Sequence, residues 1–167
     1  YSSYNSDTII EAIRYLHKHA KPGAIFIDYI QLLNLPEGKY KTYSRQEEIK
    51  EICIALKDVA VETGLPIILG AQLNRATQDS KGGKPKLENL KEAGNLEEDA
   101  NTVLSVYNES REKEETSEGE SYKGLREVEL EIKALKNREG EVNQTALRTF
   151  DKWTGVIKNS SSSGSSY

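Results

Sequence analysis

Methionine is absent from all 167 residues, and cysteine occurs once, as Cys53. A single cysteine excludes an intramolecular disulfide and suits a reducing compartment such as the cytosol. No apolar run approaches the roughly 20 residues that a membrane span needs, and the first residues lack the apolar core of a signal peptide. Because there is no initiator methionine and the chain opens at Tyr1, we expect it to be a piece of a larger protein.

Positive charge is outnumbered by negative charge. There are 23 lysines and arginines against 27 aspartates and glutamates, which gives a net charge of −4 at pH 7. This balance argues against a protein that grips DNA over its whole surface, since such proteins usually carry a basic footprint. The two histidines, His17 and His19, have no cysteine or acid at ligand spacing and so do not indicate a metal site. The length suits one domain with a core of its own.

A helix and an apolar strand are predicted near the start of the chain. Thr8 and Glu11 fit a capping box, which predicts a helix over residues 8–20. Residues 24–27 are apolar throughout, which predicts a strand that is buried on both faces and ends at Asp28.

A second helix and strand follow. A capping box begins at Ser44, and a clean apolar stripe over residues 44–63 predicts a long helix that ends at Gly64. Residues 66–71 predict another buried strand, which Gln72 follows. A strand, a helix and a strand in this order predict a parallel sheet with a right-handed crossover.

The second half of the chain is more polar and then changes its period. Residues 102–107 predict a third strand, and the acidic segment 108–124 predicts a flexible insertion because it contains almost nothing apolar. Strict alternation from Glu127 predicts a half-exposed strand. A turn at residues 136–140 then leads to a returning strand at residues 145–150.

Two polar residues stand at the ends of the predicted apolar strands, Asp28 and Gln72. Open α/β sheets bind ligands at the carboxyl ends of their strands. An apolar strand that delivers one aspartate is the layout of a Walker B motif, whose carboxylate holds a magnesium ion beside nucleotide phosphates. A strand-end glutamine is well placed to sense a γ-phosphate. Taken alone, such an aspartate is more often a turn former or a helix cap, so both interpretations stay open at this point.

Four motifs together resemble the DnaB-like replicative helicases, in that family's order. They are a Walker B segment (residues 23–33, GAIFIDYIQLL), a strand with a sensor glutamine (66–75, PIILGAQLNR), a DNA-contacting loop with an acidic helix after it (88–100, ENLKEAGNLEEDA) and a lysine and arginine-finger hairpin (133–140, KALKNREG). The resemblance implies a RecA-like P-loop NTPase core, α/β in class, with a mostly parallel sheet flanked by helices and a C-terminal β-hairpin. Residues 1–157 would form the C-terminal part of this ATPase domain, and the serine-rich tail, 158–167, would be disordered.

The resemblance also implies roles for single residues, with ATP and magnesium as cofactors. Asp28 would coordinate magnesium through water, and Gln72 would be the γ-phosphate sensor. Arg138, with Lys136 beside it, would be an arginine finger that reaches the nucleotide site of the adjacent subunit. Such an arginine makes hydrolysis depend on assembly, which implies a homo-oligomeric ring, hexameric by family analogy. Taken alone, a Lys-x-Arg in a glycine-containing hairpin is more often a solvated turn.

Two elements are candidates for contact with single-stranded DNA. The first holds the residues that fall where the family grips the strand: Lys91, Glu92 and Gly94. Backbone N–H groups hold phosphates there, and a glycine allows close approach. The second is a loop in which cations alternate with aromatics, and its candidate residues are Lys39, Lys41 and Arg45. An exposed loop with incidental lysines explains this second pattern equally well.

Some parts of the family pattern do not occur in the sequence. There is no Gly-x-x-x-x-Gly-Lys-Ser/Thr phosphate loop, no catalytic glutamate upstream of the Walker B strand, and no primase-interacting domain. We therefore expect part of an ATP-dependent replicative helicase, cytoplasmic and bacterial or phage-encoded. We expect it to be inactive as an isolated piece, with primase and a helicase loader as further partners. Two alternatives remain: another RecA-superfamily ATPase of the recombination or clock type, and an assembly module without ATPase activity.

Overall fold

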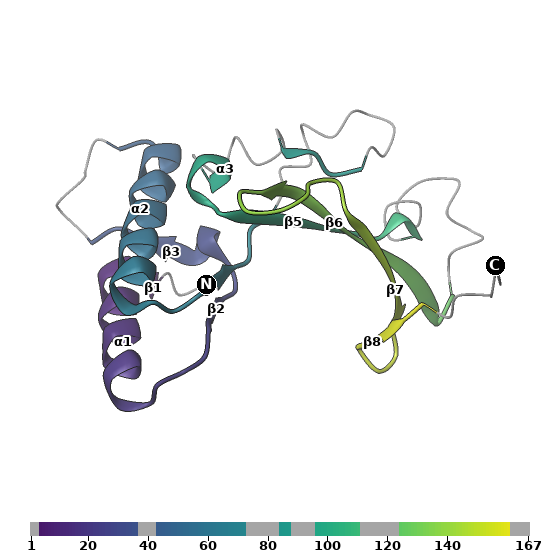
Figure 1. Cartoon of the computed structure of the whole chain (residues 1–167), viewed down its shortest axis with the longest axis horizontal. Helices are drawn as coiled ribbons and strands as arrows, with labels where there is room; N and C mark the ends of the chain where they lie inside the picture. The colour runs from purple at the N-terminus through teal and green to yellow at the C-terminus, as the bar shows by residue number, and fades with distance from the viewer. Residues whose placement is uncertain (1–3, 37–42, 73–83, 88–95, 111–123, 161–167) are drawn as a thin grey trace. The chain divides into compact units, whose positions relative to one another are not determined.

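The computed structural model describes residues 4–36, 43–72, 84–87, 96–110 and 124–160 (Figure 1). The elements in chain order are β1 (Tyr4–Asn5), α1 (Ser6–His19), β2 (Ile25–Ile27), the 3-10 helix η1 (Ile30–Leu32), β3 (Leu33–Asn34), α2 (Arg45–Thr63), β4 (Ile67–Leu69), α3 (Leu96–Asp99), β5 (Thr102–Tyr107), β6 (Glu127–Asn137), β7 (Thr145–Asp151) and β8 (Val156–Asn159). They fall into two compact units, residues 1–75 with 88–100 and residues 76–87 with 101–167. None of the helices in the described ranges is both long and apolar enough to cross a membrane.

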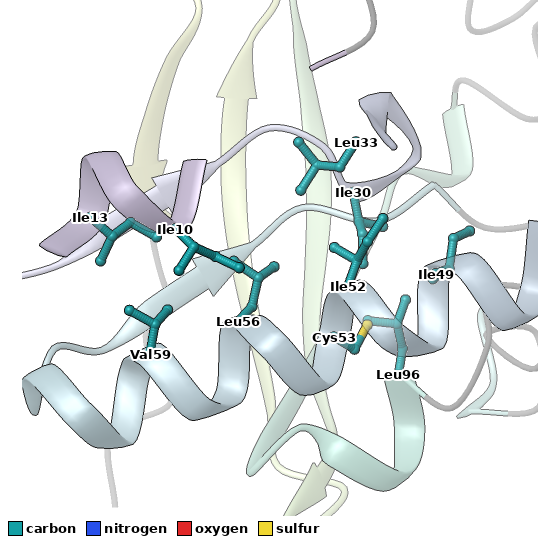
Figure 2. Close-up of a cluster of buried hydrophobic side chains, with 10 residues drawn as sticks. All are labelled: Ile10, Ile13, Ile30, Leu33, Ile49, Ile52, Cys53, Leu56, Val59 and Leu96. Atoms are coloured by element: carbon teal, nitrogen blue, oxygen red, sulfur yellow. The ribbon is translucent and has the colours of Figure 1, made fainter. Parts of the chain in front are cut away.

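The first unit contains the predicted strand-helix-strand arrangement. β2 and β4 pair in parallel, with Ile25 opposite Ile67 and Ile27 opposite Leu69, and α2 connects them along the chain. These four side chains pack against the core that α1 and α2 form. The buried side chains of that core are Ile10, Ile13, Ile30, Leu33, Ile49, Ile52, Cys53, Leu56, Val59 and Leu96 (Figure 2). Burying an aliphatic side chain of this size fully, compared with leaving it exposed, stabilises the folded state by roughly 1.5–3 kcal/mol.

Helix α2 agrees closely with the prediction. Ser44 caps its N-terminus, and the Ser44 backbone N–H donates to the Glu47 carboxylate, which completes the capping box. Gly64 ends the helix at φ 68°, a left-handed conformation that glycine adopts without steric cost. Cys53 belongs to the core, as the stripe predicts, and its burial raises the pKa of the thiol to about 12.

Two details of the N-terminal prediction are wrong. The capping residue of α1 is Asn5, whose side chain accepts from the N–H of Asp7, so the capping box that begins at Thr8 does not form. β2 and β4 are covered on one face only, because the opposed pair Phe26 and Ile68 is 76% and 44% exposed. A continuous apolar run is compatible with two buried faces, but among the described residues only one face has a helical cover.

The second unit is an antiparallel sheet in the order β5-β6-β7-β8. β5 spans residues 102–107 as predicted, and it pairs with β6. β6 alternates at first, with Val128 and Leu130 buried, and β7 returns beside it as the predicted hairpin. β8 pairs with β7 and has no counterpart among the strands predicted from the sequence. The predicted turn at Lys136 is wrong, because β6 continues to Asn137 and Lys136 lies opposite Val103 of β5.

One buried carboxylate organises the turn between β7 and β8. The side chain of Asp151 is 1% exposed and accepts two hydrogen bonds from the Arg126 guanidinium, at 3.0 and 2.8 Å. It also accepts the backbone N–H groups of Trp153 and Thr154, at 2.9 and 3.2 Å. The hydrogen bonds from Arg126, followed by those backbone donors, hold the pKa of Asp151 well below its usual range. Gly155 completes the turn at φ 70°.

This arrangement predicts a dependence of stability on pH. A carboxylate whose pKa is depressed in the folded state stabilises the fold above its unfolded pKa, about 3.9, and loses that contribution as the pH falls toward its folded pKa. We expect Asp151→Asn to lower the thermal unfolding midpoint at neutral pH and to flatten its decline below about pH 4. Circular dichroism melts over this range measure both effects. The same substitution at Asp58, which is exposed on α2, serves as the control; an unchanged acid dependence in Asp151→Asn would contradict the assignment.

Candidate nucleotide site

The candidate site begins where β2 and β4 end together. Their backbone pairing continues one step past the strands: the Gly70 N–H donates to the Ile27 carbonyl at 2.8 Å, and the Ile30 N–H donates to the Gly70 carbonyl at 3.0 Å. Asp28 lies between those two partners in the chain. Asp28 follows β2 and Gln72 follows β4, so the parallel pairing brings both residues to the same edge of the sheet, and both side chains are exposed.

The Asp28 carboxylate lies against Gly70. A Cβ atom built on Gly70 would come within 3.3 Å of Asp28 Oδ1 and 3.4 Å of the Ile27 carbonyl oxygen, so the glycine leaves room for the aspartate. An exposed carboxylate is the hard oxygen donor that Mg²⁺ prefers, and Mg²⁺ usually takes only one or two protein carboxylates, with waters and phosphates completing its shell. The described residues hold no cluster of three or more potential metal ligands. A single strand-end carboxylate fits magnesium in company with a nucleotide.

Gln72 is held by Gln31, a residue for which the sequence predicted no role. The Gln31 side chain accepts from the Gln72 N–H through Oε1 at 3.3 Å and donates to the Gln72 carbonyl through Nε2 at 3.0 Å. A signal was present in the sequence, since Gln31 is a polar residue inside an otherwise apolar run from Ile30 to Leu33. Composition and periodicity could not show which backbone groups it would meet.

Arg45, a candidate DNA contact, is engaged with the segment after η1. Its guanidinium donates to the carbonyls of Gln31 and Leu33, each at 2.9 Å, and to Asn34 Oδ1 at 3.1 Å. It also forms an ion pair with Glu48, one turn along α2. Through these contacts, Arg45 ties the start of α2 to residues 31–34. Its side chain keeps 40% exposure, so its proposed role toward DNA stays a prediction.

Arg138 and Lys136 belong to the second unit. Arg138 follows β6 directly and is exposed, and its backbone N–H donates to the Asn101 carbonyl at 3.0 Å. The Asn137 side chain accepts from the Glu139 N–H at 3.4 Å, which fixes the bend after Arg138. The hairpin is closed by bonds between Ala134 and residues 143–144 on the returning side. Arg138 is thus anchored by its own backbone while its side chain projects from an exposed bend.

The remaining candidate residues lie outside the described ranges. They are Lys39, Lys41, Lys91, Glu92 and Gly94. Most of the acidic segment 108–124 and most of the tail are also outside them. The roles proposed for these residues therefore remain predictions from the sequence.

Comparison with known protein families gives a match over nearly the whole chain. The family described as the DnaB-like helicase C-terminal domain matches residues 2–157. Among curated relatives, a "Probable plasmid replicative DNA helicase" of Chlamydia psittaci is 34% identical over 92% of this chain and 31% of its own length. A "Replicative DNA helicase DnaB" of Mycoplasma pneumoniae is 36% identical over 84% of this chain and 29% of its own length. The chain therefore spans about a third of the length of these relatives.

Solved structures agree with this match. An ATPase domain superposes with a TM-score of 0.73 at 28% identity, over 94% of this chain and 52% of its own length. A DnaB-like replicative helicase, described together with its interactions with primase, gives the same TM-score and identity over 95% of this chain and 36% of its own. The RecA-like α/β fold class expected from the sequence is confirmed.

Proposed function

The chain belongs to the DnaB-like helicase C-terminal domain family, and from that premise we propose that it is part of the ATPase domain of a replicative DNA helicase. The full-length protein assembles into a ring, hexameric by family analogy, hydrolyses ATP between adjacent subunits, and uses that energy to move along single-stranded DNA and unwind the duplex. The observation that carries this proposal is the hydrogen-bonded pairing past β2 and β4, which holds Asp28 and the backbone of Gln72 at one edge of the parallel sheet.

In this proposal the strand ends form one half of the nucleotide site. Asp28, whose carboxylate lies beside Gly70, would hold magnesium through bound water. Bound magnesium neutralises phosphate charge during phosphoryl transfer. Gln72 contacts the γ-phosphate region and responds to its loss. The phosphate loop and the catalytic glutamate come from sequence outside this chain, since no such loop occurs within it.

The other half of the site comes from the neighbouring subunit. Arg138 places its positive charge against the transferred phosphoryl group, and Lys136 adds a second charge from the end of β6. A rigid anchor suits this task because misplacement of about 1 Å is costly in catalysis. The backbone bond from Arg138 to Asn101 and the bend fixed by Asn137 supply such an anchor.

DNA is contacted from inside the ring. Lys91, Glu92 and Gly94 hold the phosphate backbone of a single strand, and Lys39, Lys41 and Arg45 offer a second contact. A ring can concentrate these few groups in its channel although the chain carries a net charge of −4. Primase is an expected protein partner by analogy with the solved relative described with primase. A helicase loader is a second expected partner, which the family resemblance alone implies. The protein works in the cytoplasm and is bacterial or phage-encoded.

The full-length protein and the isolated chain test this proposal together. We expect the full-length protein to hydrolyse ATP faster when single-stranded DNA is present and to unwind a forked duplex in the presence of magnesium. The 167-residue chain alone should give no ATP hydrolysis above background, because it carries no phosphate loop. A phosphate-release assay and a strand-displacement assay measure these activities. Robust hydrolysis by the isolated chain would contradict the proposal that the phosphate loop and the catalytic glutamate lie outside it.

The main alternative is an assembly module without ATPase activity. It predicts a full-length protein that folds and binds its partners but does not turn over ATP. The family match favours the helicase over this alternative and over an ATPase of the recombination or clock type. Absence of hydrolysis in the full-length protein, with DNA and magnesium present, would favour the assembly module.

A further inference from the structure

The carboxamide of Gln31 takes the place of a missing backbone partner. The pairing between β2 and β4 continues through Gly70, which bonds to Ile27 and Ile30 on the opposite side. After β2 the chain turns into η1, so beyond Ile30 its backbone no longer runs alongside the β4 side and cannot pair with it. Two residues after Gly70, where the next pair of backbone hydrogen bonds would fall, both the N–H and the C=O of Gln72 bond to the side-chain amide of Gln31. A glutamine carboxamide carries one acceptor and one donor group, as a peptide unit does.

Gln31 is itself fixed at its backbone. Its carbonyl accepts from Arg45 Nη2 at 2.9 Å, and the same nitrogen reaches the Leu33 carbonyl at 2.9 Å. The Leu35 N–H donates to Glu48 Oε1 at 2.8 Å, and the Glu48 carboxylate also forms an ion pair with Arg45. The start of α2 therefore holds the segment that carries Gln31, and Gln31 holds Gln72.

We propose that Gln31 is a positioning residue for Gln72: its side-chain amide fixes the backbone of Gln72 at the edge of the sheet that also carries Asp28, and so sets the direction in which the Gln72 side chain leaves the strand end. This inference rests on the proposed function, because Gln72 matters only if the site takes a nucleotide. It assigns no contact between Gln31 and ATP. The effect of Gln31 passes through Gln72 alone.

Glutamate and alanine at position 31 separate the parts of this interaction. Gln31→Glu keeps the size and one acceptor but loses the donor, and it places a carboxylate oxygen against the Gln72 carbonyl. Gln31→Ala removes both hydrogen bonds. Because misplacement of about 1 Å can cost up to a hundredfold in rate, we expect Gln31→Glu to lower the kcat of DNA-stimulated ATP hydrolysis by about tenfold or more in the full-length protein. The KM for ATP should change by less than about threefold, since the phosphate loop and most nucleotide contacts are untouched.

The matched control is Gln46→Glu, at an exposed position on α2. It introduces the same charge in the same unit and should leave kcat and KM at their wild-type values. Thermal unfolding midpoints of all variants show whether a loss of kcat follows a loss of the fold. A Gln31→Glu protein with wild-type kcat would overturn the inference.

A double-mutant cycle tests whether Gln31 acts through Gln72. If it does, the protein that carries both Gln31→Glu and Gln72→Ala should be no slower than Gln72→Ala alone, because the group being positioned is already gone. Independent roles would make the two reductions in kcat multiply, and that result would overturn the inference even if both variants fold. A purely structural role for Gln31 would also give multiplied reductions.

Hydrogen exchange distinguishes failure of this inference from failure of the proposed function. In the full-length protein, Gln31→Ala should speed backbone exchange in the peptide that contains Gln72, whereas Gln46→Ala should not. Unchanged exchange would overturn the pairing whatever the enzymatic result. If exchange changes as expected but the wild-type protein does not hydrolyse ATP, the pairing stands, whereas the proposed function and the positioning role that rests on it both fail.

Discussion

Replacing Arg138 with alanine in the full-length protein is expected to slow ATP hydrolysis by roughly a thousandfold or more, the scale of an arginine finger. The arginine is anchored by its backbone N–H to Asn101, so the substitution removes the guanidinium and keeps that bond. Binding of ATP should change far less, because the arginine acts on charge that develops during phosphoryl transfer. Steady-state hydrolysis and equilibrium binding of a non-hydrolysable ATP analogue measure the two quantities.

The control for Arg138 is Arg148→Ala on β7, whose guanidinium donates to the Leu147 carbonyl within the same sheet. That variant should keep its hydrolysis rate. Full ATPase and unwinding rates in Arg138→Ala would refute the arginine finger. They would leave the hairpin as an ordinary exposed bend.

The second large effect concerns Asp28. We expect Asp28→Asn to raise the magnesium concentration needed for half-maximal ATP hydrolysis by about 10–100-fold. This is the typical effect of changing an outer-shell partner of a metal ion. Asparagine keeps the size of the side chain and its fit beside Gly70, so the fold should be retained. The measurement is the magnesium concentration that gives half-maximal ATP hydrolysis, with Asp58→Asn as the exposed control on α2. An unchanged magnesium requirement would show that Asp28 is a turn former.

Mixing the two variants tests whether the residues act from different subunits. Neither an Arg138→Ala ring nor an Asp28→Asn ring has an intact interface. A mixed ring does have intact interfaces, where Asp28 of an Arg138→Ala subunit meets Arg138 of an Asp28→Asn subunit. Hydrolysis should therefore recover on mixing, provided that subunits exchange. Mixed rings, verified by mass, that stay inactive would place both residues at the same subunit's site.

Sequence patterns were most reliable where the deciding interactions are local. The capping box at Ser44 and the left-handed Gly64 depend on residues within a few positions, and both ends of α2 are as predicted. The strand at residues 102–107 is also as predicted, since its apolar and β-branched residues are contiguous. At α1, two residues could cap the helix, and the structure uses Asn5 in place of Thr8.

Interactions between distant segments explain what the sequence did not reveal. The pairing of Gln31 with Gln72 spans 41 positions and depends on the register of β2 against β4. The exposure of Phe26 depends on what packs on each face of the strand, which an apolar run does not specify. Family resemblance supplied the roles of Asp28, Gln72 and Arg138, and these await the experiments above.

The turn around Asp151 also equips the protein with an intrinsic optical reporter. Trp153 is the only tryptophan in the sequence, it is 76% exposed, and the Arg126 guanidinium lies 5.2 Å from the centroid of its ring. In the 167-residue chain on its own, tryptophan fluorescence excited apart from tyrosine therefore comes from this one turn. Loss of the Arg126–Asp151 pair would move the cation away from the indole and change the emission, so the β7–β8 hairpin can be followed without a label while the rest of the chain stays silent.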